Sequence, residues 1–272
     1  MMNSLKSKVA VTMALASAVA LVAMSPAGAH PGPSPAKKPT VVLVHGAFAD
    51  SSGFSGIVER LQAAGYPVVA AANPLRSLAS DAASIRALLD TIDGPIILVA
   101  HSYGGNVISA AATGDKNVKA LVYFAGYIPE TGETTAELTD KFPGSLVDSS
   151  LKQVPLPDGG IDLYIDPAKY PHAFAGGVPL KQAAALAVSQ RPATAAALNE
   201  PSTGVQAWHT IPSYVLISGS DLIIPPALQR FMAERAHAKV EVIEGASHLG
   251  VFLSHPDTAT ALIEKAARQT VK

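Results

Sequence analysis

The chain has no cysteine among its 272 residues, so neither a disulfide nor a lipid-modified N-terminal cysteine is available to it. Charged residues are also scarce, at 15%, and the formal net charge is only −1. A weakly acidic chain without a basic cluster argues against nucleic acid or an anionic membrane as partner. His172, His209 and His237 are scattered without metal-ligand spacing, so we expect no zinc site.

The N-terminus resembles an export signal. Lys6 and Lys8 precede an apolar run over 9–24, and Ala27-Gly28-Ala29 provides an Ala-x-Ala cleavage pattern. The run is short for a membrane span and no twin arginine precedes it, so we predict a cleaved secretory signal peptide over 1–29 and no stable membrane anchor. Removing its two lysines lowers the net charge from −1 to −3. We expect the mature protein to be exported.

Residues 30–39 form a short leader rich in proline, with prolines at 31, 33, 35 and 39. We expect it to be extended and outside the folded domain, which then covers 40–272. A chain of this length can bury a core sufficient for one domain.

Apolar strands alternate with amphipathic helices from residue 40 onward. We predict strands at 41–45, 67–72, 95–100, 118–124, 213–217 and 240–243, and helices at 53–64, 80–90, 106–113, 226–236 and 257–267. Strands that are apolar throughout indicate a mostly parallel sheet covered on both faces by helices, hence an α/β fold. Between about 129 and 212 the rhythm breaks, and we expect an inserted helical cap with a helix at 179–190 and another at 193–199.

The motif around Ser102 lies between a predicted strand and a predicted helix. Ala100-His101-Ser102-Tyr103-Gly104 keeps a small residue two places on either side of the serine, as a sharp strand-to-helix turn requires. Such a turn is typical of a nucleophile elbow, although Ala100 stands where the strict pattern has glycine. The motif by itself also occurs by chance.

A serine nucleophile needs a base and a group that orients the base, and two further strand ends offer them. Asp221 follows the strand at 213–217, and His248 follows the strand at 240–243. In a parallel sheet these carboxyl ends meet in one crevice. Glu244 is a second candidate for the acid. We expect His45 and His101 to orient loops, and His255 to begin a helix.

With His45-Gly46-Ala47, Ala100-His101-Ser102-Tyr103-Gly104-Gly105, Gly219-Ser220-Asp221 and Gly245-Ala246-Ser247-His248 in order, the chain from Thr40 to about Arg268 resembles an α/β-hydrolase. Within that superfamily it resembles the branch of plant methylesterases, hydroxynitrile lyases and bacterial pyrethroid-hydrolase-like enzymes. The resemblance implies Ser102 as nucleophile, His248 as general base and acid, and Asp221 as the residue that holds the imidazole. It also implies an oxyanion hole from the backbone amides of Ala47 and Tyr103.

Single positions separate the chemistries of this superfamily. Epoxide hydrolases and haloalkane dehalogenases use aspartate at the position of Ser102, and the hydroxynitrile lyases carry lysine where this chain has Leu249. Ester hydrolysis is therefore favoured.

Apolar and aromatic residues of the cap and loops could line a substrate pocket. The candidates are Phe48, Tyr164, Phe174, Leu180, Leu186, Trp208 and Leu249. Leu180, Leu186 and Val188 could instead be the buried stripe of a cap helix.

We therefore predict a secreted serine esterase that cleaves small to medium apolar carboxylic esters through an acyl-enzyme and needs no metal or organic cofactor. A cofactor-free haloperoxidase or perhydrolase would use the same three residues. A binding protein that has kept the fold without turnover is the alternative from another class.

Overall fold

The computed structural model describes residues 38–271. The predicted signal peptide and most of the predicted leader lie outside this range. No helix within 38–271 combines the length and the apolar character that crossing a membrane requires.

A six-stranded sheet forms the centre of the domain, and every neighbouring pair of its strands is parallel. Its strands are β1 Thr40–Val44, β2 Val68–Ala71, β3 Ile96–His101, β4 Val118–Phe124, β8 Ser213–Ser218 and β9 Lys239–Ile243. They lie side by side in the order β2-β1-β3-β4-β8-β9. The chain therefore reverses its direction of winding between β1 and β3, which is where ligands bind in open α/β sheets.

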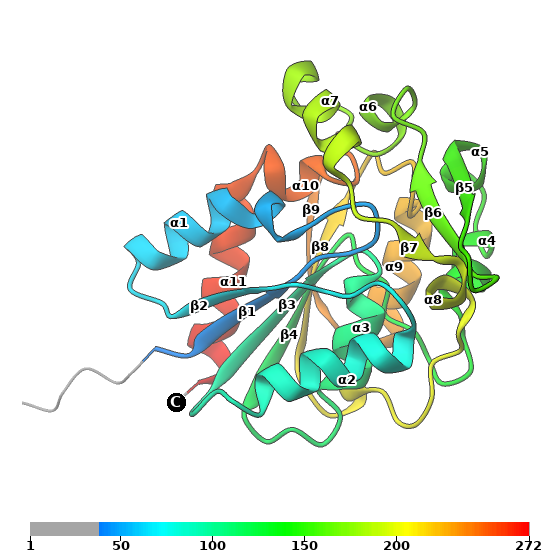
Figure 1. Cartoon of the computed structure of the whole chain (residues 1–272). Coiled ribbons are helices and arrows are strands. Elements are labelled where there is room, and N and C mark those ends of the chain that lie inside the picture. The colour runs from blue at the N-terminus through cyan, green and yellow to red at the C-terminus, as the bar shows by residue number, and fades with distance from the viewer. Residues whose placement is uncertain (1–37, 272) are drawn as a thin grey trace, which may run out of the picture. The chain divides into compact units, whose positions relative to one another are not determined.

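Helices cover both faces of this sheet (Figure 1), in agreement with the nearly continuous burial of its central strands β1, β3 and β4. The long C-terminal helix α11 (Pro256–Thr270) packs on β3, β4 and β8 and against α1 (Ser55–Ala63). On the other face α3 (Gly104–Ala111) packs on β3 and against α2 (Leu78–Leu89), and α9 (Pro226–Arg235) packs on β8. The predicted α/β architecture is confirmed.

Local sequence explains where these helices begin and end. The Ser77 side chain accepts a hydrogen bond from the Ser80 amide and so caps the start of α2. α1 is followed by Gly65, whose φ of +78° suits glycine best. A 3₁₀ turn, η1 (Ser51–Phe54), precedes α1 and overlaps the start of the helix predicted at 53–64.

The chain between β4 and β8 forms the insertion. It contains α4 Thr135–Asp140, α5 Val147–Ser150, β5 Leu151–Pro155, β6 Ile161–Ile165, α6 Tyr170–Ala173, α7 Leu180–Ser189, β7 Ala193–Thr194, α8 Ala195–Asn199 and η2 Ala207–His209. The helices expected at 179–190 and 193–199 correspond to α7 and α8, but the insertion is not only helical, because β5, β6 and β7 form an antiparallel sheet that was not predicted. β5 and β6 are joined by a turn in which Gly159 has a φ of +87°. β5 is largely exposed, so it lacks the apolar pattern that identified the central strands.

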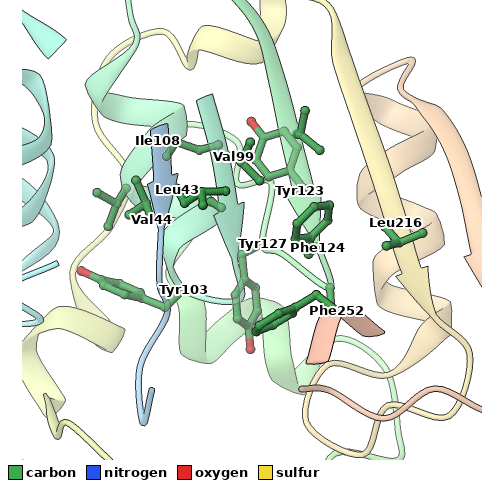
Figure 2. Close-up of a cluster of buried hydrophobic side chains, with 14 of the residues drawn as sticks. Leu43, Val44, Val99, Tyr103, Ile108, Tyr123, Phe124, Tyr127, Leu216 and Phe252 are labelled. Carbon is green, nitrogen blue, oxygen red and sulfur yellow. The ribbon is translucent and has the colours of Figure 1, made fainter. Parts of the chain in front are cut away.

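The core includes large side chains from adjacent strands of the central sheet (Figure 2), with Leu43 and Val44 from β1, Val99 from β3, and Tyr123 and Phe124 from β4. All five are fully buried. In the same view Tyr103, Tyr127 and Phe252 lie beyond the ends of the strands, toward the loops that carry the candidate site. The last short helix, α10 (Gly250–Leu253), contributes Phe252.

Candidate active site

Ser102 lies on a tight turn between β3 and α3 and has a φ of +55°, a conformation that non-glycine residues rarely adopt. Close backbone approaches explain the small residues of the motif. A β-carbon on Gly104 would lie 2.7 Å from the Val44 carbonyl oxygen, and one on Gly46 would lie 2.6 Å from the Ser102 β-carbon. Ala100 is fully buried in β3, so its methyl group is accommodated in place of the glycine of the strict pattern.

Asp221 and His248 are joined by a hydrogen bond of 2.7 Å between Oδ2 and Nδ1, and both side chains are fully buried. Asp221 Oδ1 accepts from the amides of Ile223 (2.7 Å) and Ile224 (2.9 Å), and Oδ2 also accepts from Gln229 Nε2 (2.9 Å). A carboxylate with this many donors is an acceptor and leaves the Nδ1 proton on the imidazole. Nε2 of His248 is thereby left as the ring's free acceptor.

The His248 ring lies beside the serine turn. It is 4.5 Å from the ring of His101, the residue before Ser102, and 4.8 Å from the ring of Phe174. Its Nε2 is buried and has no hydrogen-bond partner in the described chain, so Ser102 Oγ does not bond it in this conformation. Such bonds are often long before substrate is bound. Nε2 is thus available to accept a proton.

Two backbone amides next to the serine donate no hydrogen bond within residues 38–271. One is that of Ala47, in the turn after β1, and the other is that of Tyr103, which precedes the first turn of α3. The first amides of a helix have no partner within the helix. Both residues border the same cavity as Ser102, so this cavity has two unused donors near the nucleophile candidate.

The histidines beside the motifs have fixed hydrogen-bonding roles. His45 Nε2 accepts from the Asn73 amide (3.0 Å), which leaves Nδ1 to donate to the Gly46 carbonyl (2.9 Å). His101 Nε2 lies 3.2 Å from the His248 carbonyl oxygen. Burial lowers the pKa of His45 and holds that of His101 well below 6.5. Both are neutral residues that connect loops, as expected from the sequence.

The other candidates for the acid and the base lie elsewhere. Glu244 is 80% exposed and faces Arg230, with 3.8 Å between Oε1 and Nη2. His255 immediately precedes α11. No three His, Asp or Glu side chains in the described part of the chain gather closely enough to hold a metal ion.

Two residues that the sequence did not single out support the site. Gln229, in α9, donates to Asp221 while its Oε1 accepts from the Ser218 amide (3.0 Å). Asp81, in the first turn of α2, is fully buried and accepts from the Tyr103 hydroxyl (2.9 Å), and burial raises its pKa. In sequence Asp81 resembles an ordinary helix-start acid and Gln229 a helix-surface residue, so no pattern marked either.

The cavity at Ser102 encloses about 250 Å³. Its apolar wall combines loop residues with residues of the insertion: Ala47, Phe48, Val147, Leu151, Leu163, Leu198 and Ile223. Its polar wall is formed by Tyr127, Thr135, Thr139, Asp140, Asp148, Gln153 and Asn199. The substrate-sized space therefore lies between the serine turn and the insertion.

Of the predicted pocket residues, only Phe48 borders this cavity, and the prediction is corrected for the others. Leu180 is 74% exposed and Val188 is 78% exposed, so neither residue lines the pocket or lies on a buried face of the helix. Phe174 is buried against His248, and Trp208 donates from Nε1 to the Pro129 carbonyl (2.7 Å). Leu186 and Leu249 border a separate cavity of about 10 Å³, and Tyr164 borders an outer groove of the insertion. The pocket is instead formed largely by the α4 to β6 region, whose strands were not predicted.

A six-stranded parallel sheet with a strained serine after β3, an aspartate after β8 and a histidine after β9 defines an α/β-hydrolase. The sequence profile of the alpha/beta hydrolase family matches residues 41–261, and the chain belongs to that family. The membership predicted from the motifs is confirmed.

Known proteins similar to this chain include a curated fungal relative and the solved structures of two esterases. Alpha/beta hydrolase nvfD of Aspergillus novofumigatus (strain IBT 16806) is 26% identical over 257 residues, covering 86% of this chain and 99% of the relative. The crystal structure of polyneuridine aldehyde esterase is similar with a TM-score of 0.72 and 18% identity, covering 84% of this chain and 99% of that one. Methylesterase MES16 from Arabidopsis has a TM-score of 0.68 and 20% identity, covering 85% and 99%.

Proposed function

We propose that this hydrolase is a serine esterase that cleaves small to medium carboxylic esters through an acyl-enzyme. The observation that carries the proposal is the buried hydrogen bond between Asp221 and His248, which leaves the unpaired Nε2 of His248 beside the Ser102 turn. Two similar structures are named as esterases, which agrees with this chemistry.

In the proposed mechanism Ser102 Oγ attacks the ester carbonyl while His248 Nε2 takes its proton. Asp221 keeps the Nδ1 proton in place and stabilises the imidazolium that forms. The imidazolium then gives its proton to the alcohol oxygen, the C–O bond breaks and the alcohol leaves. Water then attacks the carbonyl of the acyl-enzyme while His248 takes a proton from the water. The ester bond to Ser102 breaks, the proton returns to Ser102 Oγ, and the acid leaves.

The amides of Ala47 and Tyr103 are the proposed donors to the oxyanion that develops during each attack. Neither is engaged in a hydrogen bond within residues 38–271, and both border the cavity with Ser102. Loss of one such donor lowers kcat by about 10²–10³ in comparable enzymes.

The proposed substrates are uncharged esters whose acyl and alcohol parts together fit about 250 Å³. Leu151, Leu163 and Leu198 provide contact for an apolar group. Within the described range 38–271 no Lys, Arg or His lines this wall, whereas Asp140 and Asp148 are both part of it. An ester with an additional carboxylate would therefore be repelled.

An activity-based label and an ester panel test this function. We expect a fluorophosphonate probe to label wild-type protein at Ser102, Ser102→Ala to lose both labelling and turnover, and Ser84→Ala, an exposed serine in α2, to keep both. The kcat/KM of neutral esters should be about fivefold higher than that of size-matched anionic esters. The double substitution D140N/D148N should reduce this ratio. A folded wild type that is neither labelled nor active on any ester would contradict the proposal.

We also propose that the protein is exported after cleavage behind Ala29, on the strength of the basic start, the apolar run and the Ala-x-Ala pattern. Mass spectrometry of protein from the culture medium or the periplasm should show His30 as the first residue. An intact Met1 on the exported protein would contradict cleavage.

A further inference from the structure

The turn that carries the Ala47 amide is held in an unfavourable conformation. Phe48, the residue after Ala47, has a φ of +62° and is 3% exposed. A bulky residue with left-handed backbone does not keep that conformation by its own preference, so the surroundings must impose it. The hydrogen bonds of Phe48 show which part of the molecule imposes this conformation.

Both backbone polar groups of Phe48 are bonded to the insertion. Its amide donates to the Arg191 carbonyl (3.0 Å), in the segment between α7 and β7, and its carbonyl accepts from the Tyr170 hydroxyl (3.0 Å), at the start of α6. No other hydrogen bond engages the Tyr170 hydroxyl within residues 38–271. Two segments of the insertion therefore hold the turn at Phe48 by hydrogen bonds.

The Tyr170 side chain is well suited to a fixed donor role. It is 1% exposed, and its ring packs 4.8 Å from that of Phe174, which contacts Phe48 edge-on at 6.0 Å. Burial raises the pKa of the Tyr170 hydroxyl, so it stays protonated and donating across the working range of a hydrolase.

The same short segment also reaches the histidine. The Phe174 ring lies 4.8 Å from the His248 ring, and the Phe174 carbonyl accepts from the Leu249 amide (3.0 Å). Residues 170–174 thus contact both the turn that carries the Ala47 amide and the loop that carries His248. The turn follows β1, and the loop follows β9.

We infer that Tyr170 is a positioning residue for catalysis: its hydroxyl, acting through the Phe48 carbonyl, aims the Ala47 amide at the developing oxyanion. The inference rests on the proposed esterase function. It gives the insertion a second role beside forming the pocket, because the oxyanion turn has its required shape only while α6 is docked on it.

Tyr170→Phe tests this role by removing the hydroxyl and keeping the ring that packs on Phe174. We expect kcat for a neutral ester to fall about tenfold, less than the 10²–10³ for outright loss of a donor, with KM nearly unchanged. Affinity for a trifluoromethyl ketone, whose adduct carries an oxyanion, should fall by a similar factor. Binding of the product acid should not change.

Tyr123→Phe is the matched control. Tyr123 is also fully buried, its hydroxyl bonds Ser109 Oγ (2.9 Å) in α3, and it does not border the described cavity at Ser102. Y123F removes a comparable hydrogen bond, so the two variants should lose similar thermal stability while only Y170F loses kcat.

Two results would overturn the inference, and they are distinguishable. If wild-type protein hydrolyses esters and Y170F matches it in kcat and in trifluoromethyl ketone affinity, the positioning role is wrong and the esterase function stands. If wild-type protein hydrolyses no ester, the proposed function fails, and the role of Tyr170 fails with it.

Discussion

At the scale of single residues, the way Asp221 is held explains how the imidazole is oriented. Three donors besides His248 bond its two oxygens, from Ile223, Ile224 and Gln229. The carboxylate is therefore fixed before substrate arrives, and its orientation determines which nitrogen of His248 faces the serine turn.

Asp221→Asn should lower kcat by as much as about 10⁴, because an amide can donate to Nδ1 and so favour the wrong tautomer of His248. Steady-state kinetics on a neutral ester would measure the loss. Glu244→Gln is the control and should leave kcat unchanged, since Glu244 is exposed. Near-normal turnover in D221N would mean that another group orients His248.

At the scale of elements, the serine turn depends on how closely β1, β3 and α3 approach one another. Gly104 lies where any β-carbon would meet the backbone of β1, and a β-carbon on Gly105 would overlap the Tyr127 carbonyl oxygen. Backbone cannot move aside as the end of a side chain can. These two glycines are thus required by packing between elements as well as by the turn itself.

Gly104→Ala should destabilise the fold by about 1–3 kcal/mol and reduce labelling of Ser102, because the added methyl group lies 2.7 Å from the Val44 carbonyl oxygen. Urea unfolding and the rate of fluorophosphonate labelling would measure both effects. In Gly53→Ala the nearest atom is 3.6 Å away, on Phe252, so this control should cost little. Equal stability of the two variants would show that α3 can shift outward.

At the scale of the whole molecule, buried titratable groups link stability to pH. His45 and His101 are buried with pKa values below 6.5, so the unfolded chain binds more protons than the folded one as the pH falls below that value. The contribution that these two neutral histidines make to the free energy of unfolding is fully present above about pH 6.5 and is lost on acidification. Asp81 acts in the opposite sense: burial raises its pKa, so its contribution to stability decreases as the pH rises above the unfolded value of about 4.

Between pH 6.5 and 5 the free energy of unfolding should fall by up to about 1.4 kcal/mol per pH unit for each of these two histidines. Urea unfolding at several pH values would measure the slope. His101→Gln, which keeps a donor near the Nε2 position, should reduce it. His237→Asn, at an exposed position, should not. A slope that is the same in wild type and H101Q would contradict the assignment.

Elements with a continuous apolar pattern could be predicted from the sequence, whereas residues placed by contacts between distant segments could not. The central strands were predicted because burial on both faces makes them continuously apolar, as in Ile96-Ile97-Leu98-Val99. β5 was missed because it is largely exposed, and six of the seven pocket predictions failed because the region from α4 to β6 forms a large part of the cavity wall. Tyr170 had no local signal either, since its partner Phe48 lies 122 residues away.

The sequence by itself determined the parallel sheet, the family and the order of Ser102, Asp221 and His248, because strand hydrophobicity and turn chemistry are local properties of the chain. Only the tertiary structure decided what surrounds those residues. Asp81 under Tyr103, Gln229 behind Asp221 and Tyr170 on the turn after Ala47 are contacts between distant segments. Such contacts depend on how the insertion and the helices dock, and no periodicity in the chain encodes that.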